Sequence, residues 1–310
     1  MRPLIDILLT TFNGEKYISE QIDSIFNQEF RSWRLLIRDD GSSDNTVSII
    51  NKYKSTHPDK ITIINDFFGN LGTAQSFSHL LQEIKAPYVA FCDQDDVWLP
   101  NKLQKQMELM QRVESRLGKH CPILVNSDLC VANKELSLLS SSFWKYQMLD
   151  PVRMESFEKL LLQNYVTGCT CLLNRKLVEL SMPIPSKAIT HDWWIALVAI
   201  AKGKIINMPD VTVIYRQHDR NDTGAKKWGM RHILITIVNG PRQWRANLMK
   251  TRDQARELIN TGLLDDNESV VVRNYVDMFD KTWFWRRVSM IRGGFMKYGV
   301  TRNIAMFLLL

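Results

Sequence analysis

Hydrophobic residues recur with two different periods along the N-terminal third of the chain. Short β-branched runs are typical of strands, and the segments between them repeat apolar residues every three or four positions, as helices do. The predicted strands are 4–9, 33–38, 61–65 and 88–92, and the predicted helices are 15–27, 44–55 and 73–84. This alternation predicts an α/β fold, with a mostly parallel sheet covered by helices on both faces and right-handed crossovers.

The pattern continues as a mixture of helices and strands up to about residue 224. Helices are expected at 100–117, 156–163 and 192–201, and strands at 123–126, 169–173, 205–208 and 211–215. From about Ala225 the pattern becomes helical, basic and aromatic. We therefore predict one α/β domain over residues 1–224, with halves 1–99 and 100–224, and a helical extension over residues 225–310.

The basic charge of the chain is concentrated in that extension. The formal net charge is +7, and residues 225–310 hold 15 Lys and Arg against 7 Asp and Glu. Around Trp283–Val288 the basic residues alternate with aromatic ones, which favours an anionic partner such as a membrane surface. Two alternatives stay open, because such a stripe also packs on the α/β domain or on a second subunit of a homodimer.

Cysteine usage and the N-terminus point to the cytoplasmic side of a membrane. The five cysteines are odd in number and show no CxxC spacing, which is typical of reduced thiols. No signal peptide is recognisable, and no apolar run reaches the roughly 20 residues of a spanning helix. The sequence predicts a cytoplasmic protein, peripheral on the inner face of the plasma membrane.

Three polar clusters, at residues 11–15, 39–42 and 93–96, directly follow three predicted strands. Because the carboxyl ends of parallel strands meet at one edge, where such sheets bind ligands, we expect these clusters to converge. Asp93 and Asp95 offer the hard oxygen ligands that suit Mg²⁺ or Mn²⁺ bound together with substrate phosphates. The alternative is a solvated acidic turn that caps the following helix.

The other two clusters have similar interpretations. The carboxylate of Asp40 can accept a hydrogen bond from N3–H of uracil or thymine, although 39–44 also reads as turn and helix-cap chemistry. Thr11, Asn13 and the amide at Glu15 can contact ribose or diphosphate oxygens at a helix N-terminus.

Four segments in order resemble the successive motifs of glycosyltransferase family 2: 7–13 (ILLTTFN), 38–44 (RDDGSSD), 70–72 (NLG) and 93–100 (DQDDVWLP). The resemblance covers residues 4–224 and implies a GT-A fold. It implies that Asp95 is the main metal ligand and that Asp93 contacts ribose or a metal-bound water. By the same resemblance Asp40 reads a pyrimidine and Thr11 helps to hold the nucleotide.

The second half of the α/β domain holds the expected catalytic base. Asp192 opens an apolar helix at the position where the family carries its base, so the resemblance implies that it deprotonates the acceptor hydroxyl. On local sequence alone, a helix-capping role for Asp192 explains the residue equally well. His191 departs from the acid common at that position, and we assign it an orienting role or an acceptor contact.

Further contacts are expected on both substrates. Arg216 and His218 lie in a YRQH segment that resembles bacterial rhamnosyltransferases of the family, which implies contacts to the diphosphate or the metal. Gly168 resembles an acceptor-side turn. Trp98 and either Trp193 or Trp194 are candidates for stacking on sugar faces, although tryptophans in apolar surroundings are usually core residues.

The resemblance implies an inverting, metal-dependent glycosyl transfer. The favoured donor is dTDP-β-L-rhamnose and the favoured acceptor a polyprenyl-diphosphate-linked saccharide, as in polysaccharide synthesis. The alternative is a family 2 transferase with a UDP-hexose donor. A nucleic-acid-binding protein leaves the acidic clusters unexplained, and a Rossmann dehydrogenase lacks its G-x-G-x-x-G fingerprint.

Overall fold

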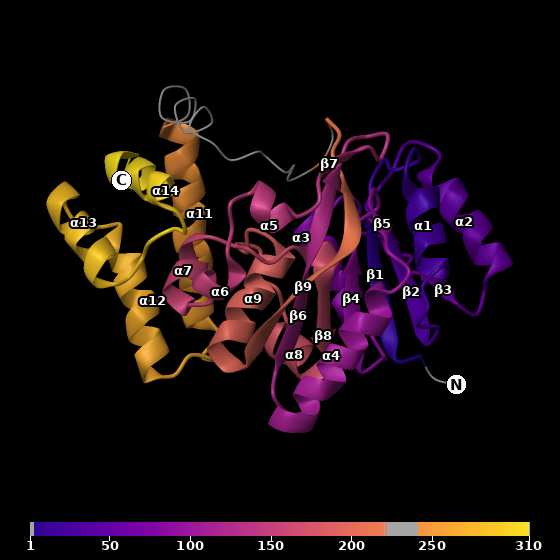
Figure 1. Ribbon diagram of the computed structural model, residues 1–310, viewed down its shortest axis with the longest axis horizontal. Helices are drawn as coiled ribbons and strands as arrows, with labels where there is room; N and C mark the ends of the chain where they lie inside the picture. The colour runs from indigo at the N-terminus through magenta and orange to yellow at the C-terminus, as the bar shows by residue number, and fades with distance from the viewer. Residues whose placement is uncertain (1–2, 220, 222–240, 310) are drawn as a thin grey trace.

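One mixed sheet of nine strands forms the centre of the molecule (Figure 1). The computed structural model describes residues 3–219, 221 and 241–309. The strand order is β3-β2-β1-β4-β8-β6-β9-β5, with β7 paired to β6. The strands are β1 (Ile5–Thr11), β2 (Trp33–Asp39), β3 (Ile61–Ile63), β4 (Tyr88–Cys92), β5 (Val97–Trp98), β6 (Ile123–Ala132), β7 (Leu138–Ser140), β8 (Cys171–Asn174) and β9 (Lys204–Arg216).

The sheet is parallel in its N-terminal half and mixed beyond it. Strands β3, β2, β1 and β4 pair in parallel, as the strand–helix alternation predicts. Strand β8 then runs antiparallel to both of its neighbours, β4 and β6. Strand β9 returns to the parallel direction beside β6, and the short strand β5 is antiparallel to it. The mostly parallel α/β sheet predicted from the sequence is confirmed.

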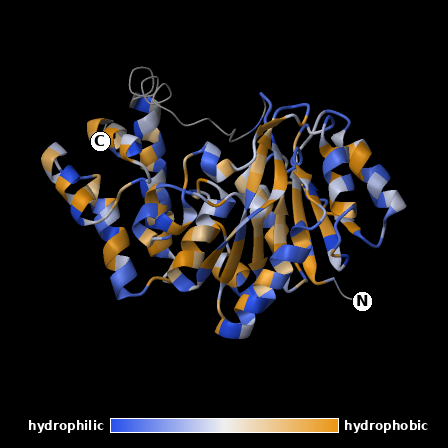
Figure 2. Cartoon of the chain, in the orientation of Figure 1, coloured by the Kyte–Doolittle hydropathy of each residue, from blue (hydrophilic) through white to orange (hydrophobic). Residues whose placement is uncertain are grey.

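Both faces of the sheet are buried, each in its own hydrophobic cluster. Along β1, Ile5, Ile7 and Leu9 point into one cluster and Leu8 into the other, as the two-residue period of a strand requires. Figure 2 shows hydrophobic residues concentrated in the strands. One cluster is covered by α1 (Ile18–Phe26), α2 (Thr46–Thr56) and α4 (Lys102–Leu117). The opposite one is covered by α3 (Thr73–Gln82), α7 (Phe157–Leu162), α8 (Arg175–Ser181) and α9 (His191–Lys202).

The C-terminal helices extend the second of these clusters. Leu258, Tyr275, Phe295 and Met306 are buried together with residues of α7 and α9. The helices are therefore packed on the α/β part through a shared core. They are α11 (Pro241–Asn260), α12 (Asp266–Met278), α13 (Trp283–Arg292) and α14 (Val300–Leu309). The predicted domain boundary near residue 225 lies outside the described residues.

Strand β9 differs from the prediction of two strands separated by Pro209. It runs from Lys204 to Arg216 without a break, and its pairing with β6 shifts register at the proline. Met208 pairs with Ser127 and Val211 with Asp128, so Pro209, which has no N–H to donate, is skipped by the ladder. The elements β5, β7, α5 (Phe143–Tyr146), α6 (Pro151–Met154) and α8 were not predicted. Within the described residues, no helix is both long and apolar enough to cross a membrane.

Candidate active site

A cavity of about 1060 Å³ opens at the carboxyl edge of the parallel strands. Thr11 from the end of β1, Asp40 after β2, and Asp93 and Asp95 after β4 all line it. Asp192 of α9 lines the same cavity. The structure therefore brings together the donor-side clusters and the candidate base, as parallel strand ends predict.

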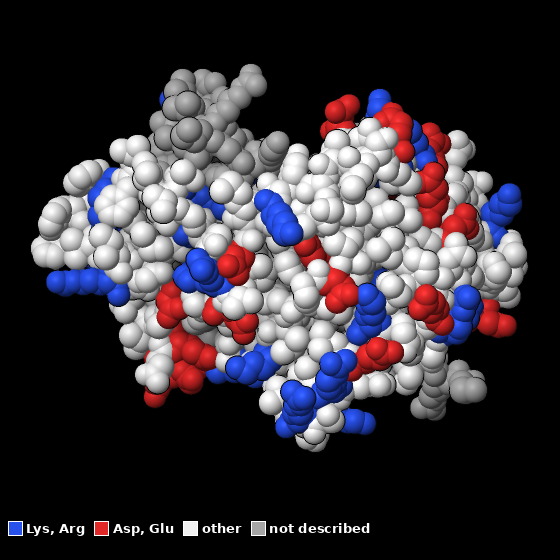
Figure 3. Space-filling model, in the orientation of Figure 1, with Lys and Arg blue, Asp and Glu red and all other residues white. Residues whose placement is uncertain are grey.

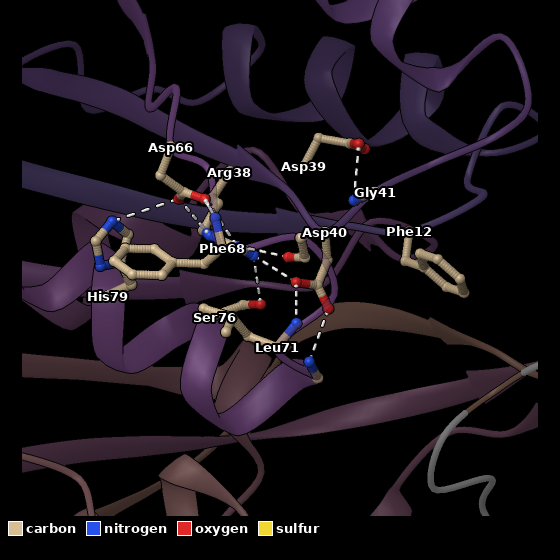
Figure 4. Close-up of polar contacts among 12 residues, drawn as sticks. Phe12, Arg38, Asp39, Asp40, Gly41, Asp66, Phe68, Leu71, Ser76 and His79 are labelled. Carbon is tan, nitrogen blue, oxygen red and sulfur yellow. Dashed lines mark hydrogen bonds and ion pairs between the residues drawn. The ribbon is translucent and has the colours of Figure 1, made fainter.

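Asp40 is held in place by a buried network (Figure 4). Its two carboxylate oxygens accept hydrogen bonds from the backbone amides of Leu71 (2.7 Å) and Gly72 (2.8 Å). Arg38, which is 1% exposed, donates to Asp40 and bonds Asp66 through two nitrogens at 2.7 and 3.1 Å. Arg38 is also the main reason why the pKa of Asp66 lies below its ordinary value. The network fixes Asp40 and the loop at 70–72 on one wall of the cavity.

Asn13 and Glu15 connect two loops and do not line the cavity. The side-chain oxygen of Asn13 accepts from the amide of Ser43 at 2.8 Å, and Glu15 accepts from the amide of Asn45 at 3.0 Å. Thr11 lies in the cavity wall, and its hydroxyl donates to Asp39 at 2.8 Å. The predicted ribose or diphosphate contacts of Asn13 and Glu15 are thus not supported by their positions, whereas Thr11 is placed to contact a ligand.

Asp95 and His218 form a close pair beside the cavity. The Nε2 atom of His218 lies 2.8 Å from Oδ2 of Asp95, and Nδ2 of Asn221 lies 3.3 Å from the same oxygen. The ring of His218 stacks on Tyr17 with 4.8 Å between centroids. Burial raises the pKa of Asp95, and His218 opposes this by favouring the ionised carboxylate. The structure thus places His218, predicted to contact the diphosphate or the metal, next to Asp95, the predicted metal ligand.

Arg216 contacts the 93–96 loop on the side away from the cavity. Its guanidinium donates to the carbonyls of Asp95 and Lys134, both at 2.9 Å, and to the carboxylate of Glu20. It is 2% exposed, lies over the ring of Tyr17 and does not line the cavity. The structure therefore does not support the predicted contact between Arg216 and the diphosphate, and it makes Arg216 a positioning residue for Asp95.

Two sets of side chains near the loop are candidate metal ligands. Asp93, Asp96 and Cys169 place their ligand atoms within 4.8 Å of one another. Burial raises the pKa of Asp96 and of Cys169 well above their ordinary values, which favours a neutral acid and a thiol, both poor ligands. Asp93 and Asp95 instead offer the carboxylate oxygens that suit Mn²⁺ or Mg²⁺, and His218 adds an imidazole nitrogen 2.8 Å from the carboxylate of Asp95.

Asp192 lies at the second position of α9, behind the N-cap residue Thr190. One carboxylate oxygen accepts from the amide of Gly168 at 2.9 Å, and the other from its neighbour Trp193 at 2.6 Å and from the hydroxyl of Thr190. Asp192 is therefore not the N-cap residue, as the helix-capping interpretation requires, because α9 begins at His191 and its N-cap is Thr190.

His191 and Gly168 lie in contact in the cavity wall. A Cβ atom on Gly168 would lie 2.8 Å from Nε2 of His191, so a larger residue there would displace the ring. His191 is 5% exposed and packs on Phe77 and Phe91, and burial lowers its pKa to about 4. Neither ring nitrogen has a hydrogen-bond partner in the described part of the chain. His191 is thus a neutral imidazole in the cavity wall, with both ring nitrogens buried.

The tryptophans predicted to stack on sugars divide into two groups. Trp98 is 2% exposed within the core and does not line the cavity, so its predicted sugar contact is not supported. Trp193 lines the cavity and donates its indole N–H to the carbonyl of Leu160 at 2.7 Å. Trp194 is 1% exposed and does not line the cavity either, so of the three only Trp193 is placed to contact an acceptor.

Residues that sequence reasoning missed come from the C-terminal helices. One face of α11 forms a cavity wall through Trp244, Asn247, Leu248 and Thr251, and Lys297 adds to it from the α13–α14 loop. The sequence feature that could have identified the α11 residues is their spacing of three or four positions, which places them on one side of a helix.

Comparisons with known proteins agree with this geometry. The description "Glycosyl transferase family 2" belongs to the family that matches residues 6–179, more than half of the chain. The dTDP-rhamnosyl transferase RfbG of Shigella flexneri is 25% identical over 230 residues, 70% of this chain and 74% of that protein. The putative glycosyltransferase EpsE of Bacillus subtilis is 31% identical over 110 residues, 36% of this chain and 39% of that protein.

Solved structures show the same fold at low identity. S. aureus TarS 1–349 in complex with UDP-GlcNAc has a TM-score of 0.58 and 15% identity, over 100% of this chain and 80% of that one. The mannosyltransferase PcManGT of Pyrobaculum calidifontis, in complex with GDP-Man and Mn²⁺, has a TM-score of 0.53 and 16% identity. The match covers 95% of this chain and 86% of that one. The GT-A fold expected from the sequence is confirmed, and the chain belongs to glycosyl transferase family 2.

Proposed function

We propose that the protein is an inverting, metal-dependent transferase that moves L-rhamnose from dTDP-β-L-rhamnose to a lipid-linked saccharide. The observation that carries the reaction type is the single cavity in which Asp40, Asp93 and Asp95 face the same space as Asp192. The donor is supported by the similarity to a dTDP-rhamnosyl transferase. Inversion is supported by the position of Asp192, which can act as the base of a single displacement without a covalent intermediate.

Each wall of the cavity has a separate task. Asp40, fixed by Arg38, accepts N3–H of the pyrimidine, and Thr11 contacts the nucleotide. Asp192 takes the proton of the acceptor hydroxyl. The hydroxyl oxygen of the acceptor attacks the anomeric carbon of the donor sugar as the bond from that carbon to the nucleoside diphosphate breaks. A divalent cation held by Asp93, Asp95 and His218 supplies charge neutralisation for the leaving diphosphate. His191 and Trp193 contact the acceptor.

The second candidate donor is a UDP-hexose. The neighbour TarS is solved with UDP-GlcNAc, and thymine and uracil present the same N3–H to Asp40. The two donors differ at the base 5-methyl group and in the sugar, so purified protein should be assayed with dTDP-rhamnose, UDP-glucose, UDP-galactose and UDP-GlcNAc. Product mass and linkage analysis identifies the transferred sugar. Transfer of a hexose in preference to rhamnose would replace the proposed donor.

We also propose that the protein works at a membrane surface, where such an acceptor is found. The helices α13 and α14 expose large apolar side chains, and Lys281 and Arg292 lie exposed next to them. In Figure 3 this end of the molecule is mainly uncharged with Lys and Arg at its margin. The exposed apolar residues are Trp283, Phe284, Trp285, Ile291, Val300, Ile304 and Leu308.

A further inference from the structure

Charge is unevenly distributed along the walls of the cavity. Among the described residues that line it, the only Lys or Arg side chains are Lys250 of α11 and Lys297 of the α13–α14 loop. The acidic ones all come from the α/β part and face the donor or the reacting hydroxyl. They are Asp40, Asp93, Asp95 and Asp192. The wall built by the C-terminal helices is thus the cationic wall of an otherwise acidic cavity.

Lys297 is a partly buried cation without a counter-ion. Its Nζ lies 5.4 Å from the ring centroid of Trp244 and has neither a hydrogen bond nor an ion pair within the described structure. Burial, together with a smaller effect of the nearby charge of Arg302, lowers its pKa to about 8. An ammonium group removed from water without an anion is unfavourable. A ligand anion would remove that cost.

The position of α11 relative to the candidate base is fixed. The amide of Ile189 donates to Oε1 of Gln254 at 2.9 Å, which anchors α11 beside the segment that leads into Asp192. Lys250 lies four residues before Gln254, about 6 Å along the helix axis, and Trp244 lies about 15 Å along it. Asn247 and Thr251 line the wall near the lysine. Asp192 and Lys250 therefore line the same cavity from elements whose relative position is fixed.

We propose that Lys250 and Lys297 bind a phosphoryl group of the acceptor, so that the enzyme glycosylates a sugar close to a phosphate or diphosphate ester. The proposal rests on the proposed function and specifies its acceptor class. An ammonium group binds phosphate as a point charge, and Trp244 offers an aromatic face to the adjacent sugar. The step that supplies this substrate must be a sugar-phosphate transfer or an early glycosylation of its product.

A matched pair of acceptors tests this selectivity. In one, N-acetylglucosamine or rhamnose is joined through a diphosphate to a ten-carbon prenyl chain, and in the other the same sugar is joined directly to that chain. For Lys250→Met and Lys297→Met we expect the ratio of kcat/KM for the diphosphate acceptor to that for the uncharged acceptor to fall about tenfold or more. Lys119→Met, an exposed lysine outside the cavity, is the charge-matched control and should keep the wild-type ratio.

A binding measurement gives a readout that does not need turnover. Inorganic diphosphate is titrated calorimetrically in EDTA, and the two cavity variants should bind it about tenfold more weakly than wild type or Lys119→Met. Lys297→Met should also raise the melting temperature by about 2–4 °C, because it removes an unpaired desolvated charge. A residue with a merely structural role would lower it.

Three results would overturn the proposal. They are an unchanged acceptor ratio in both variants, equal diphosphate affinity in all four proteins, and a rise in donor KM that matches the loss on the acceptor. The last would assign the lysines to the donor diphosphate. Failure of the proposed function is distinct, because then no nucleotide sugar is consumed with either acceptor.

Discussion

Asp192 accepts backbone hydrogen bonds and also faces the cavity as the proposed base. Its carboxylate oxygens accept from the amides of Gly168 and Trp193, which holds the group at the cavity wall. Asp192→Asn keeps the size and one acceptor oxygen but cannot take a proton, so kcat should fall by at least about 100-fold. Steady-state kinetics and calorimetric donor titration should show this loss with donor Kd changed less than about twofold. Joint loss of donor binding and folding would instead give Asp192 a structural role.

Arg38 does not line the cavity, yet we expect donor binding to depend on it, because it holds Asp40, the proposed contact to the pyrimidine. Arg38→Met leaves Asp40 and Asp66 without their buried partner, which should destabilise the protein by about 3–5 kcal/mol. Donor KM should rise in parallel. Urea unfolding and donor kinetics measure the two effects. The control is Arg153→Met, since Arg153 is 74% exposed beside Asp150 and should change stability by less than about 1 kcal/mol.

His191 should make stability depend on acidic pH. Its pKa is lowered from 6.5 to about 4 by burial, so between these values the unfolded chain binds a proton that the folded protein does not. Stability is therefore lost as pH falls from 6.5 towards 4, by up to about 1.4 kcal/mol per pH unit. In His191→Gln this part of the slope should disappear, as urea unfolding at pH 4.5, 5.5 and 6.5 would show. If the free energy of unfolding changed with pH equally in wild type and His191→Gln, that result would contradict a neutral His191 in the folded protein.

The loop after β4 is the element on which the proposed metal binding depends. Asp93 and Asp95 line the cavity, and Asp95 is in contact with His218. EDTA should abolish transfer, and Mn²⁺ or Mg²⁺ should restore it. Asp95→Asn should lower kcat/KM by about 100-fold or more at saturating metal, whereas Asp59→Asn, at an exposed position outside the cavity, serves as the control. Full activity of chelated protein would show that the diphosphate is neutralised by protein groups alone.

The sequence predicts elements better than it predicts the direction of side chains. Convergence of Asp40 and Asp95 was predictable because neighbouring parallel strands end at one edge whatever surrounds them. The direction of Arg216 was not, because a long side chain is oriented by partners distant in sequence, here Glu20 and Lys134. Lys297 was still less accessible to prediction, since its approach to the cavity depends on how the α13–α14 loop packs.

At the scale of the molecule, the C-terminal helices belong to the catalytic unit. Met290, Phe295 and Met306 are buried in the core shared with α7 and α9, and Lys297 lines the cavity. Removing α13 and α14 would therefore expose the core and open the cavity together. Membrane binding has to be tested with point substitutions on the exposed surface of these helices.

Phe284 and Trp285 suit this test, because they are 58% and 56% exposed and pack mainly on each other. The double variant Phe284→Ser/Trp285→Ser should bind vesicles of mixed neutral and anionic phospholipid about tenfold more weakly than wild type, since two aromatic side chains no longer enter the interface. Vesicle sedimentation measures the partition. Phe67→Ser, at a fully exposed phenylalanine of the α/β part, is the matched control and should bind as wild type does. Unchanged vesicle binding with a fall from dimer to monomer in light scattering would make this surface a contact between two copies of the chain.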